Sequence, residues 1–438
     1  MQIERTKLLA VLSEALDSVE KEFLGVTDHH AKRVALLCVR MARAAGMTDA
    51  ELSTLAINAL LHDSALNEHR SLYSQAVVPP DALRGHCIAG EENLRLLPGD
   101  VSRGFVLYHH ENSDGSGPFG KTSEDTPLGA QLIHIADQVD RRFPTGAMTA
   151  NGLGAIRTFV RESRDTLFSR QACELLLSVM TEETLTELSD EKIADAVMEI
   201  PDEVYETDLR ALSGLFARII DYKSPFTRDH SVGLAEKAEA MARYYGWDDE
   251  LTHQLYCAGA LHDIGKLLVD RDVLEKPGKL DQREYQHIQS HAYETFRLLS
   301  RLSVLDPVTR WASYHHEKLN GKGYPFGLTE KDLDEQSRLL ACLDIYQALT
   351  EDRPYKAGMS HGKAISILRE MAEKGELDEK ITEDIDRVFR TGEESSGEKC
   401  TALFQCKVCG HICEDDALPD GYVCPVCGQN ATAFLRIS

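Results

Sequence analysis

The second half of the chain contains histidine and aspartate residues at spacings that suit a metal centre. The pair His262-Asp263 precedes the pair His315-His316, and single candidate ligands lie around both pairs. Imidazole and carboxylate groups together suit iron, manganese or zinc, and one carboxylate can bridge two such ions. A centre with two ions polarises phosphoryl oxygen and generates hydroxide near neutral pH. These residues therefore indicate a metal-dependent enzyme, and such a centre supplies what hydrolysis of a phosphodiester requires.

The same pattern occurs earlier in the chain, which indicates an internal repeat. Leu61-His62-Asp63 aligns with Leu261-His262-Asp263, and His109-His110-Glu111 aligns with His315-His316-Glu317. Single residues match in the same order: His30 with His230, His86 with His291, and Asp137 with Asp344. We therefore predict a duplicated domain, with copies at residues 1–200 and 201–390.

Apolar residues recur at helical spacing in each copy. Leu234, Ala238, Met241 and Tyr245 form a stripe before Gly246, and Val34, Cys38, Met41 and Ala45 repeat it before Gly46. Residues 155–179 and 364–389 have the same spacing, so each copy is expected to close with helices. The predicted fold class is all-α. The acidic stretch 181–207 is expected to join the copies, and residues 391–399 are expected to be a flexible linker.

Residues 222–390 resemble the HD-GYP family of metal-dependent phosphodiesterases, through the His-Asp pair, the Gly323-Tyr324-Pro325 loop and the segment 353–356. The resemblance implies cyclic di-GMP as substrate, with pGpG or GMP as product, and two iron or manganese ions. One ion would be bound by His230, His262, Asp263 and Asp344. The other would be bound by His291, His315 and His316, with Asp263 bridging.

The resemblance also implies roles for residues around these ligands. Asp263 and Lys266 would be catalytic, and Lys266, Tyr324, Arg353 and Lys356 would bind the substrate. Two positions depart from the family pattern. Asn320 stands where aspartate is usual, and Phe226 stands where some members have a glutamate that recruits a third metal. Two ions are therefore the expectation.

The first copy keeps the metal ligands but loses the groups that hold phosphate. Its expected second metal site, for up to two ions, consists of His30, His62, Asp63, His86, His109, His110 and Asp137. Leu66 replaces the lysine, the loop 115–118 has no tyrosine, and no Arg-Pro-Tyr-Lys segment follows. Arg141 and Arg142 could replace the lost cations. A structural metal domain and a weak catalytic domain both remain open for this copy.

Residues 400–438 contain two C-x-x-C turns, which predict a four-thiolate metal site at Cys406, Cys409, Cys424 and Cys427. The segment resembles the short rubredoxin-like domain of rubrerythrins. This resemblance implies a small β-rich domain that holds one iron ion, with zinc as the alternative, and a possible electron-transfer partner. Redox state could then regulate the helical metal centre. Cys38, Cys173, Cys257, Cys400 and Cys413 are expected to be thiols that bind no metal.

Composition narrows the range of partners. The formal net charge of the 438-residue chain is −24, with 72 acidic and 48 basic residues. This charge argues against binding polymeric nucleic acid through a phosphate-binding surface. No apolar stretch approaches the ~20 residues that span a bilayer, and the first residues do not resemble a signal peptide. We therefore expect a cytoplasmic protein with no membrane contact.

Two alternatives to a phosphodiesterase remain at this stage. Some HD-domain proteins resemble myo-inositol oxygenase and use a di-iron centre on O₂, and an electron-carrying tail would suit that chemistry. The Gly323-Tyr324-Pro325 loop instead belongs to the phosphodiesterase relatives. The other alternative is a non-enzymatic sensor of nucleotide or redox state. The apparent completeness of the second copy argues against it.

Overall fold

The structure is a computed structural model. It describes residues 5–66, 80–201, 209–223, 230–276, 278–352 and 357–390, together with the backbone of three strands in the C-terminal part. Packing divides the chain into one unit at Met1–Phe389 and another at Arg390–Ser438. The boundary near residue 200 stays a prediction, and the expected linker 391–399 lies outside the described residues. Among the helices described, none has the length and apolar character to cross a bilayer.

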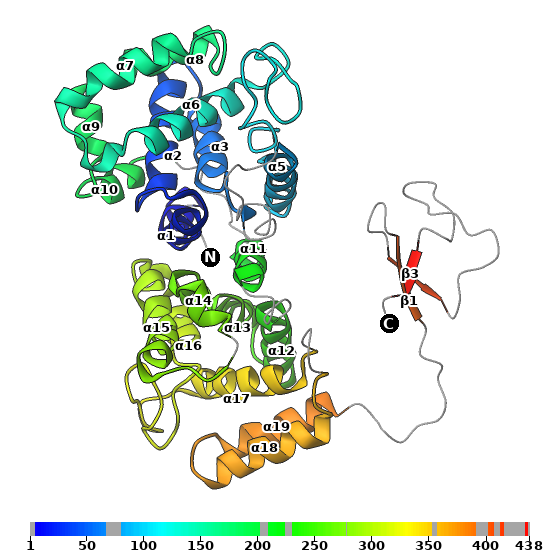
Figure 1. Cartoon of the computed structure of the whole chain (residues 1–438). Coiled ribbons are helices and arrows are strands. Elements are labelled where there is room, and N and C mark those ends of the chain that lie inside the picture. The colour runs from blue at the N-terminus through cyan, green and yellow to red at the C-terminus, as the bar shows by residue number, and fades with distance from the viewer. Residues whose placement is uncertain are drawn as a thin grey trace. The chain divides into compact units, whose positions relative to one another are not determined.

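Helices make up the first unit (Figure 1). The first copy contains α1 (Arg5–Leu24), α2 (His30–Ala44), α3 (Asp49–Leu60), α5 (Pro80–Arg95), α6 (Leu128–Arg142), η2 (Thr145–Ala147), η3 (Ala150–Gly152), α7 (Leu153–Glu162), α8 (Arg170–Val179), α9 (Glu182–Leu188) and α10 (Ile193–Met198). The second copy contains α11 (Leu209–Lys223), α12 (His230–Tyr244), α13 (Asp249–Leu261), η4 (Ile264–Leu268), α14 (Arg271–Leu274), α15 (Gln282–Leu299), η5 (Ser303–Leu305), α16 (Asp306–Ser313), α17 (Glu335–Thr350), α18 (His361–Glu373) and α19 (Glu379–Phe389).

The duplication is visible in these bounds. Helices α2 and α12 each have 15 residues, and each ends just before a glycine with positive φ, Gly46 or Gly246. The following helices also begin alike, because Thr48 caps α3 and Asp248 caps α13 through a side-chain oxygen. The predicted apolar stripes are buried at most of their positions, although Ala45 is exposed. The all-α prediction is therefore confirmed for the first unit.

The stretch 181–207 differs from the expected connection. Its described part forms α9 and α10, and α10 packs against α1 and α2. Leu185, Leu188, Ile193 and Val197 from these helices are buried in the core. Because their side chains are needed to complete the first copy, this part of the stretch belongs to that domain. Residues 202–208 lie outside the described residues.

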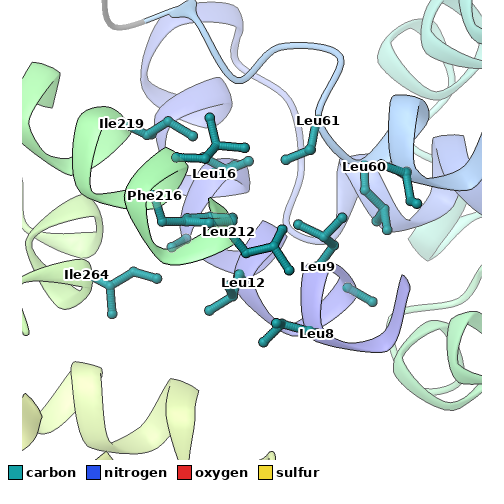
Figure 2. Packing of buried hydrophobic residues seen from close by; sticks show 14 of the residues in the cluster. Leu8, Leu9, Leu12, Leu16, Leu60, Leu61, Leu212, Phe216, Ile219 and Ile264 are labelled. Carbon is teal, nitrogen blue, oxygen red and sulfur yellow. The ribbon is translucent and has the colours of Figure 1, made fainter. Parts of the chain in front are cut away.

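One apolar core runs through both copies. Leu12 and Leu16 of α1 lie in the same cluster as Phe216 of α11 and Ile264 of η4, as Figure 2 shows. Helix α1 contacts α2 and α3 in its own copy, and η4 and α15 in the other. Since η4 directly follows the His262-Asp263 pair, the first helix of one copy supports the metal centre of the other.

The C-terminal unit contains a small antiparallel sheet. Strand β1 (Ala402–Cys406) lies between β2 (Ile412–Asp415) and β3 (Phe434–Arg436). In this register Phe404 is paired with Cys413 of β2 and Arg436 of β3. The four expected cysteine ligands have no described side chains. The four-thiolate site consequently stays a prediction.

Candidate metal centres

Five helices and one turn bring the predicted ligands of the second copy together. His230 begins α12, His262 and Asp263 follow α13, and His291 lies in α15. His315 and His316 follow α16, and Asp344 lies in α17. Potential ligand atoms lie within 4.8 Å of one another in three groups of this copy's described residues. Two of them, His230, His262 and Asp344, and His291, His315 and His316, correspond to the two ligand sets that the resemblance implies. The third group, His262, Asp263 and His315, links these two sets.

The carboxylate of Asp263 lies between these groups. Its Oδ2 is 3.1 Å from His262 Nε2, and its Oδ1 is 3.3 Å from His291 Nε2. His262 Nε2 and Asp263 Oδ1 are buried without a hydrogen bond. Buried polar atoms without a partner are costly unless they bind something else. This geometry suits a carboxylate that bridges two cations, and the residues fit a binuclear metal centre.

Hydrogen bonds from Nδ1 orient His230, His262, His291 and His315 so that Nε2 faces the centre. His262, His291 and His315 each donate from Nδ1 to the carbonyl three residues earlier, at 2.6–2.7 Å. His230 Nδ1 instead lies 2.8 Å from Glu351 Oε2. A second-shell acceptor of this kind fixes the ring and raises the basicity of the ligand.

The burial of the centre controls its protonation. Burial and the charge of nearby His316 lower the pKa of His291 to about 3, against the opposing charge of Asp263. Burial likewise lowers the pKa of His316 to about 4. Burial alone would raise the pKa of Asp344, but hydrogen bonding to His230 holds it well below its usual range. Neutral His291 and His316 beside the ionised Asp344 are donors ready for a cation. His230 differs, because burial would lower its pKa but hydrogen bonds to Asp344 and Glu351 raise it to about 10, so this ring must lose a proton when a metal binds.

Lys266 and Tyr324 lie at the same centre, as the sequence predicts. Lys266 Nζ is 2.5 Å from Asp263 Oδ2. The ring of Tyr324 lies 4.7 Å from that of His316, measured between centroids. The two other expected substrate-binding residues, Arg353 and Lys356, lie outside the described residues, as does Phe226. Asn320 accepts a hydrogen bond from the Lys322 amide within the turn, so this departure preserves a local turn contact.

Glu317 organises the loop that contains Tyr324, a role that the sequence analysis missed. Its carboxylate is buried and accepts hydrogen bonds from the amides of Phe326, Gly327 and Leu328 at 2.7–3.1 Å. Gly323 packs so closely that a Cβ atom would lie 2.4 Å from Glu317 Cα. The loop thus depends on the buried carboxylate of Glu317 and on the absence of a side chain at Gly323. The adjacency of Glu317 to the histidine pair was the available signal.

The first copy repeats this geometry with its seven predicted ligands. His30 Nε2 lies 3.2 Å from Asp137 Oδ1, and His86 Nε2 lies 3.3 Å from Asp63 Oδ1. Asp63 again has both carboxylate oxygens buried without a hydrogen bond. The groups His30, His62 and Asp137, and His86, His109 and His110, again have ligand atoms within 4.8 Å. These residues also fit a metal centre.

The surroundings of the first centre differ from those of the second. Leu66 is fully buried in the apolar core, and Pro118 follows the loop glycine where the second copy has Tyr324. Arg141 Nη1 lies 3.6 Å from Asp137 Oδ2, which brings one of the two noted arginines to the ligands. His30 Nδ1 forms a hydrogen bond of 2.7 Å with Asp140 Oδ2, a contact that the sequence analysis did not predict.

A thiol also lies at the first centre. Cys87 is fully buried, with Sγ 3.8 Å from His86 Nε2 and 3.7 Å from His109 Nδ1. Burial alone would raise the pKa of Cys87, but charge on His109 and His86 lowers it to about 7. The sequence analysis missed this residue, although its position next to His86 was a signal. Cys38, Cys173 and Cys257 are buried and lie outside the ligand groups found among the described residues.

Comparison with known proteins matches three parts of the chain to known families. Residues 27–142 and 214–381 each match an HD domain family, and residues 404–434 match a family described as rubrerythrin, rubredoxin-like domain. The 3′3′-cGAMP-specific phosphodiesterase 1 of Vibrio cholerae is 30% identical over 392 residues, which are 86% of this chain and 90% of that relative. The chain belongs to the HD-GYP phosphodiesterase family. It combines tandem HD domains with a C-terminal rubredoxin-like domain.

Other relatives share shorter parts of this HD-GYP chain. The 3′3′-cGAMP-specific phosphodiesterase 3 of Vibrio cholerae is 38% identical, over 68% of this chain and 64% of the relative. A cyclic di-GMP phosphodiesterase of Pseudomonas aeruginosa is 35% identical, over 42% and 44% of the two chains. A crystal structure of a cyclic GMP-AMP-specific phosphodiesterase from V. cholerae superposes with a TM-score of 0.63 at 22% identity, covering 90% of this chain and 100% of that one. This likeness confirms the helical HD fold.

Proposed function

We propose that the second copy is a metal-dependent phosphodiesterase that hydrolyses a cyclic dinucleotide at a binuclear centre. The observation that carries the proposal is the position of Asp263, with one carboxylate oxygen toward His262 and the other toward His291. Family membership and the named activities of the relatives support the same reaction. The expected metals are iron or manganese, because the donors are imidazole and carboxylate.

Two bound divalent ions would supply Lewis-acid activation of the phosphodiester and of the attacking water. The chain's own residues orient the reactants. Lys266 is held by Asp263 and presents a cation for a phosphate oxygen. Burial alone would lower the pKa of Lys266, but the charge of Asp263 raises it, so the lysine stays protonated. Tyr324 lies beside His316, whose side chain is 27% exposed, so this edge of the centre is open to a ligand. We assign Tyr324, Arg353 and Lys356 to substrate binding.

We propose cyclic di-GMP as the substrate, with 3′3′-cGAMP as the second candidate. Relatives named for each nucleotide match this chain, and one that covers 86% of it is named for 3′3′-cGAMP. Both nucleotides present the same phosphodiester to Lys266. Discrimination would therefore come from contacts to the bases rather than from the metal ligands.

The test is hydrolysis of both nucleotides by the full-length protein, loaded anaerobically with iron or with manganese and assayed in both redox states. We expect one or both nucleotides to be cleaved, and the ratio of kcat/KM values identifies the substrate. Lys266→Ala should keep its metal and lose about 10²–10³-fold in kcat. The double variant His262→Ala/Asp263→Ala should lose metal and turnover. Intact nucleotides with metal-loaded protein in both states would refute the proposal.

A further inference from the structure

The two metal centres differ at one further buried position. His86 of the first copy aligns with His291 of the second, so Cys87 takes the place of Ala292. Both residues are fully buried. The alignment holds in space as well. Gly90 aligns with Thr295, and each lies near the carbonyl of the histidine in its own His-Asp pair. Gly90 lies near the His62 carbonyl, and the Thr295 hydroxyl donates to the His262 carbonyl at 2.9 Å. The second copy therefore has a methyl group where the first has a thiol.

The thiol lies beside a group of potential metal-ligand atoms. His109 Nδ1, 3.7 Å from Cys87 Sγ, donates to the Val106 carbonyl, so His109 would offer its Nε2 to a metal. Cys87, His86, His109 and His110 have one potential ligand atom each within 4.8 Å of the others. Two ligands of a four-coordinate zinc ion, at about 2.0–2.3 Å from the metal, are separated by a few ångströms. The 3.8 Å between Cys87 Sγ and His86 Nε2 is close to such a spacing. Asp63 adds two buried carboxylate oxygens without hydrogen bonds beside this group.

The first centre is also more enclosed than the second. His110 is buried, whereas its counterpart His316 is only partly buried. Leu66 is fully buried where Lys266 is partly exposed in the second copy. A structural zinc site has four protein ligands and is closed, whereas a catalytic site keeps a position for water or substrate. The first centre thus has the donors and the enclosure of a structural site.

We propose that the first copy holds a mixed-donor metal site in which Cys87 joins His86, His109 and His110, and that this site takes a thiophilic ion such as zinc. Thiolate favours zinc over manganese, whereas imidazole and carboxylate alone accept iron or manganese. The duplicated domains would then hold different metals for different purposes. The proposal concerns the first copy alone and stands whether or not the second copy hydrolyses a nucleotide.

Cadmium NMR of the full-length protein tests the proposal, with cadmium as the probe in place of the native ions. The cadmium chemical shift separates a site with one thiolate from sites with only nitrogen and oxygen donors, and from a four-thiolate site in the tail. We expect a one-thiolate signal that disappears in Cys87→Ala, a variant that installs the alanine of the second copy. The matched control is Cys173→Ala, a buried thiol of the same copy that contacts the Val160 carbonyl.

Zinc retention gives a second measurement that is independent of activity. Cys87→Ala should bind zinc in the first copy about 10- to 100-fold more weakly, by competition with a chelator, while Cys173→Ala should match the parent protein. Cys87→Ser and circular dichroism show whether a lost signal reflects lost folding. A folded Cys87→Ala protein with an unchanged cadmium spectrum and unchanged zinc affinity would overturn the proposal. A parent protein without a one-thiolate signal would also overturn it.

Discussion

Glu14 of α1 and Arg297 of α15 join the two HD copies through an ion pair of 2.7 Å between Oε1 and Nη1. Arg301 and Lys32 also lie within 3.3 Å of the Glu14 carboxylate, and the Lys32 side chain is fully buried. Helix α15 contains the metal ligand His291. One carboxylate therefore connects a buried cation of the first copy with the helix that supports the metal centre of the second.

Glu14→Gln should destabilise the protein at neutral pH and less so in acid. Burial alone would raise the pKa of Glu14, but the hydrogen bond from Arg297 and the charges of Lys32, Arg297 and Arg301 lower it from 4.5 to about 2. A lowered folded-state pKa stabilises the fold above the unfolded value, and that stabilisation fades as pH falls from 4.5 toward 2. We expect a loss of about 1.5–3 kcal/mol at pH 7 and a smaller loss at pH 4.

Urea denaturation of both proteins at the two pH values measures this difference. Metal ligands that titrate in acid affect both proteins alike and cancel in the comparison. The control is Glu335→Gln, which removes an exposed ion pair with Lys380 and should cost about 0–1 kcal/mol. An equal loss at pH 7 and pH 4 would show that Glu14 acts through packing rather than through its charge.

Glu351→Gln should weaken metal binding in the second copy. Glu351 holds Nδ1 of His230, whose Nε2 lies 3.0 Å from Asp344. Loss of the anionic acceptor leaves the ring less basic and less firmly oriented, so the affinity should fall about 10–100-fold. Competition with a chelator gives the affinity, and Glu383→Gln on the exposed face of α19 is the control. Unchanged affinity in Glu351→Gln would exclude a positioning role.

The sequence indicated the candidate ligands and the helices, because both repeat along the chain, and metal binding by these ligands stays a prediction. The bridging role of Asp263 is implied by the family resemblance, and the geometry around its carboxylate suits that role. Glu351 and Asp140 could not be assigned in this way, because each copy holds its first histidine with a carboxylate from a different position. Cys87 was missed because adjacent residues on a helix point in different directions, so its position next to His86 was too weak a signal to assign the thiol to the same centre.

Contacts between the copies were beyond prediction for a different reason. The apolar residues Leu12, Phe216 and Ile264 each suit the core of their own copy by periodicity. Nothing local indicates that they share one cluster. The stretch 181–207 did contain a usable signal, because Leu185, Leu188 and Ile193 recur at near-helical spacing. Its acidic composition instead suggested a connection between the two copies, which describes this stretch less well than a pair of packed helices.

His109→Ala/His110→Ala in the full-length protein should remove metal from the first copy and leave most of the hydrolysis. The first centre lacks the lysine and the tyrosine of the second, so its loss should have little effect on turnover. The matched variant His315→Ala/His316→Ala should remove metal from the second copy and abolish hydrolysis. Elemental analysis and nucleotide turnover are measured on both. Loss of hydrolysis with an intact second centre would show that the first copy is catalytic.

The rubredoxin-like tail should make the oxidised protein red. Four thiolates around ferric iron give an intense charge-transfer colour, which dithionite should bleach, and Cys424→Ser/Cys427→Ser should remove it.

If this iron supplies electrons to the HD centre, reduction should change the rate of cyclic dinucleotide hydrolysis, because the charge of a metal sets the acidity of its water. The same variant should then slow reduction of the HD centre, while Cys173→Ala should not. Colourless protein with zinc in the tail would exclude the redox role, and a red tail with redox-independent hydrolysis would exclude only the coupling.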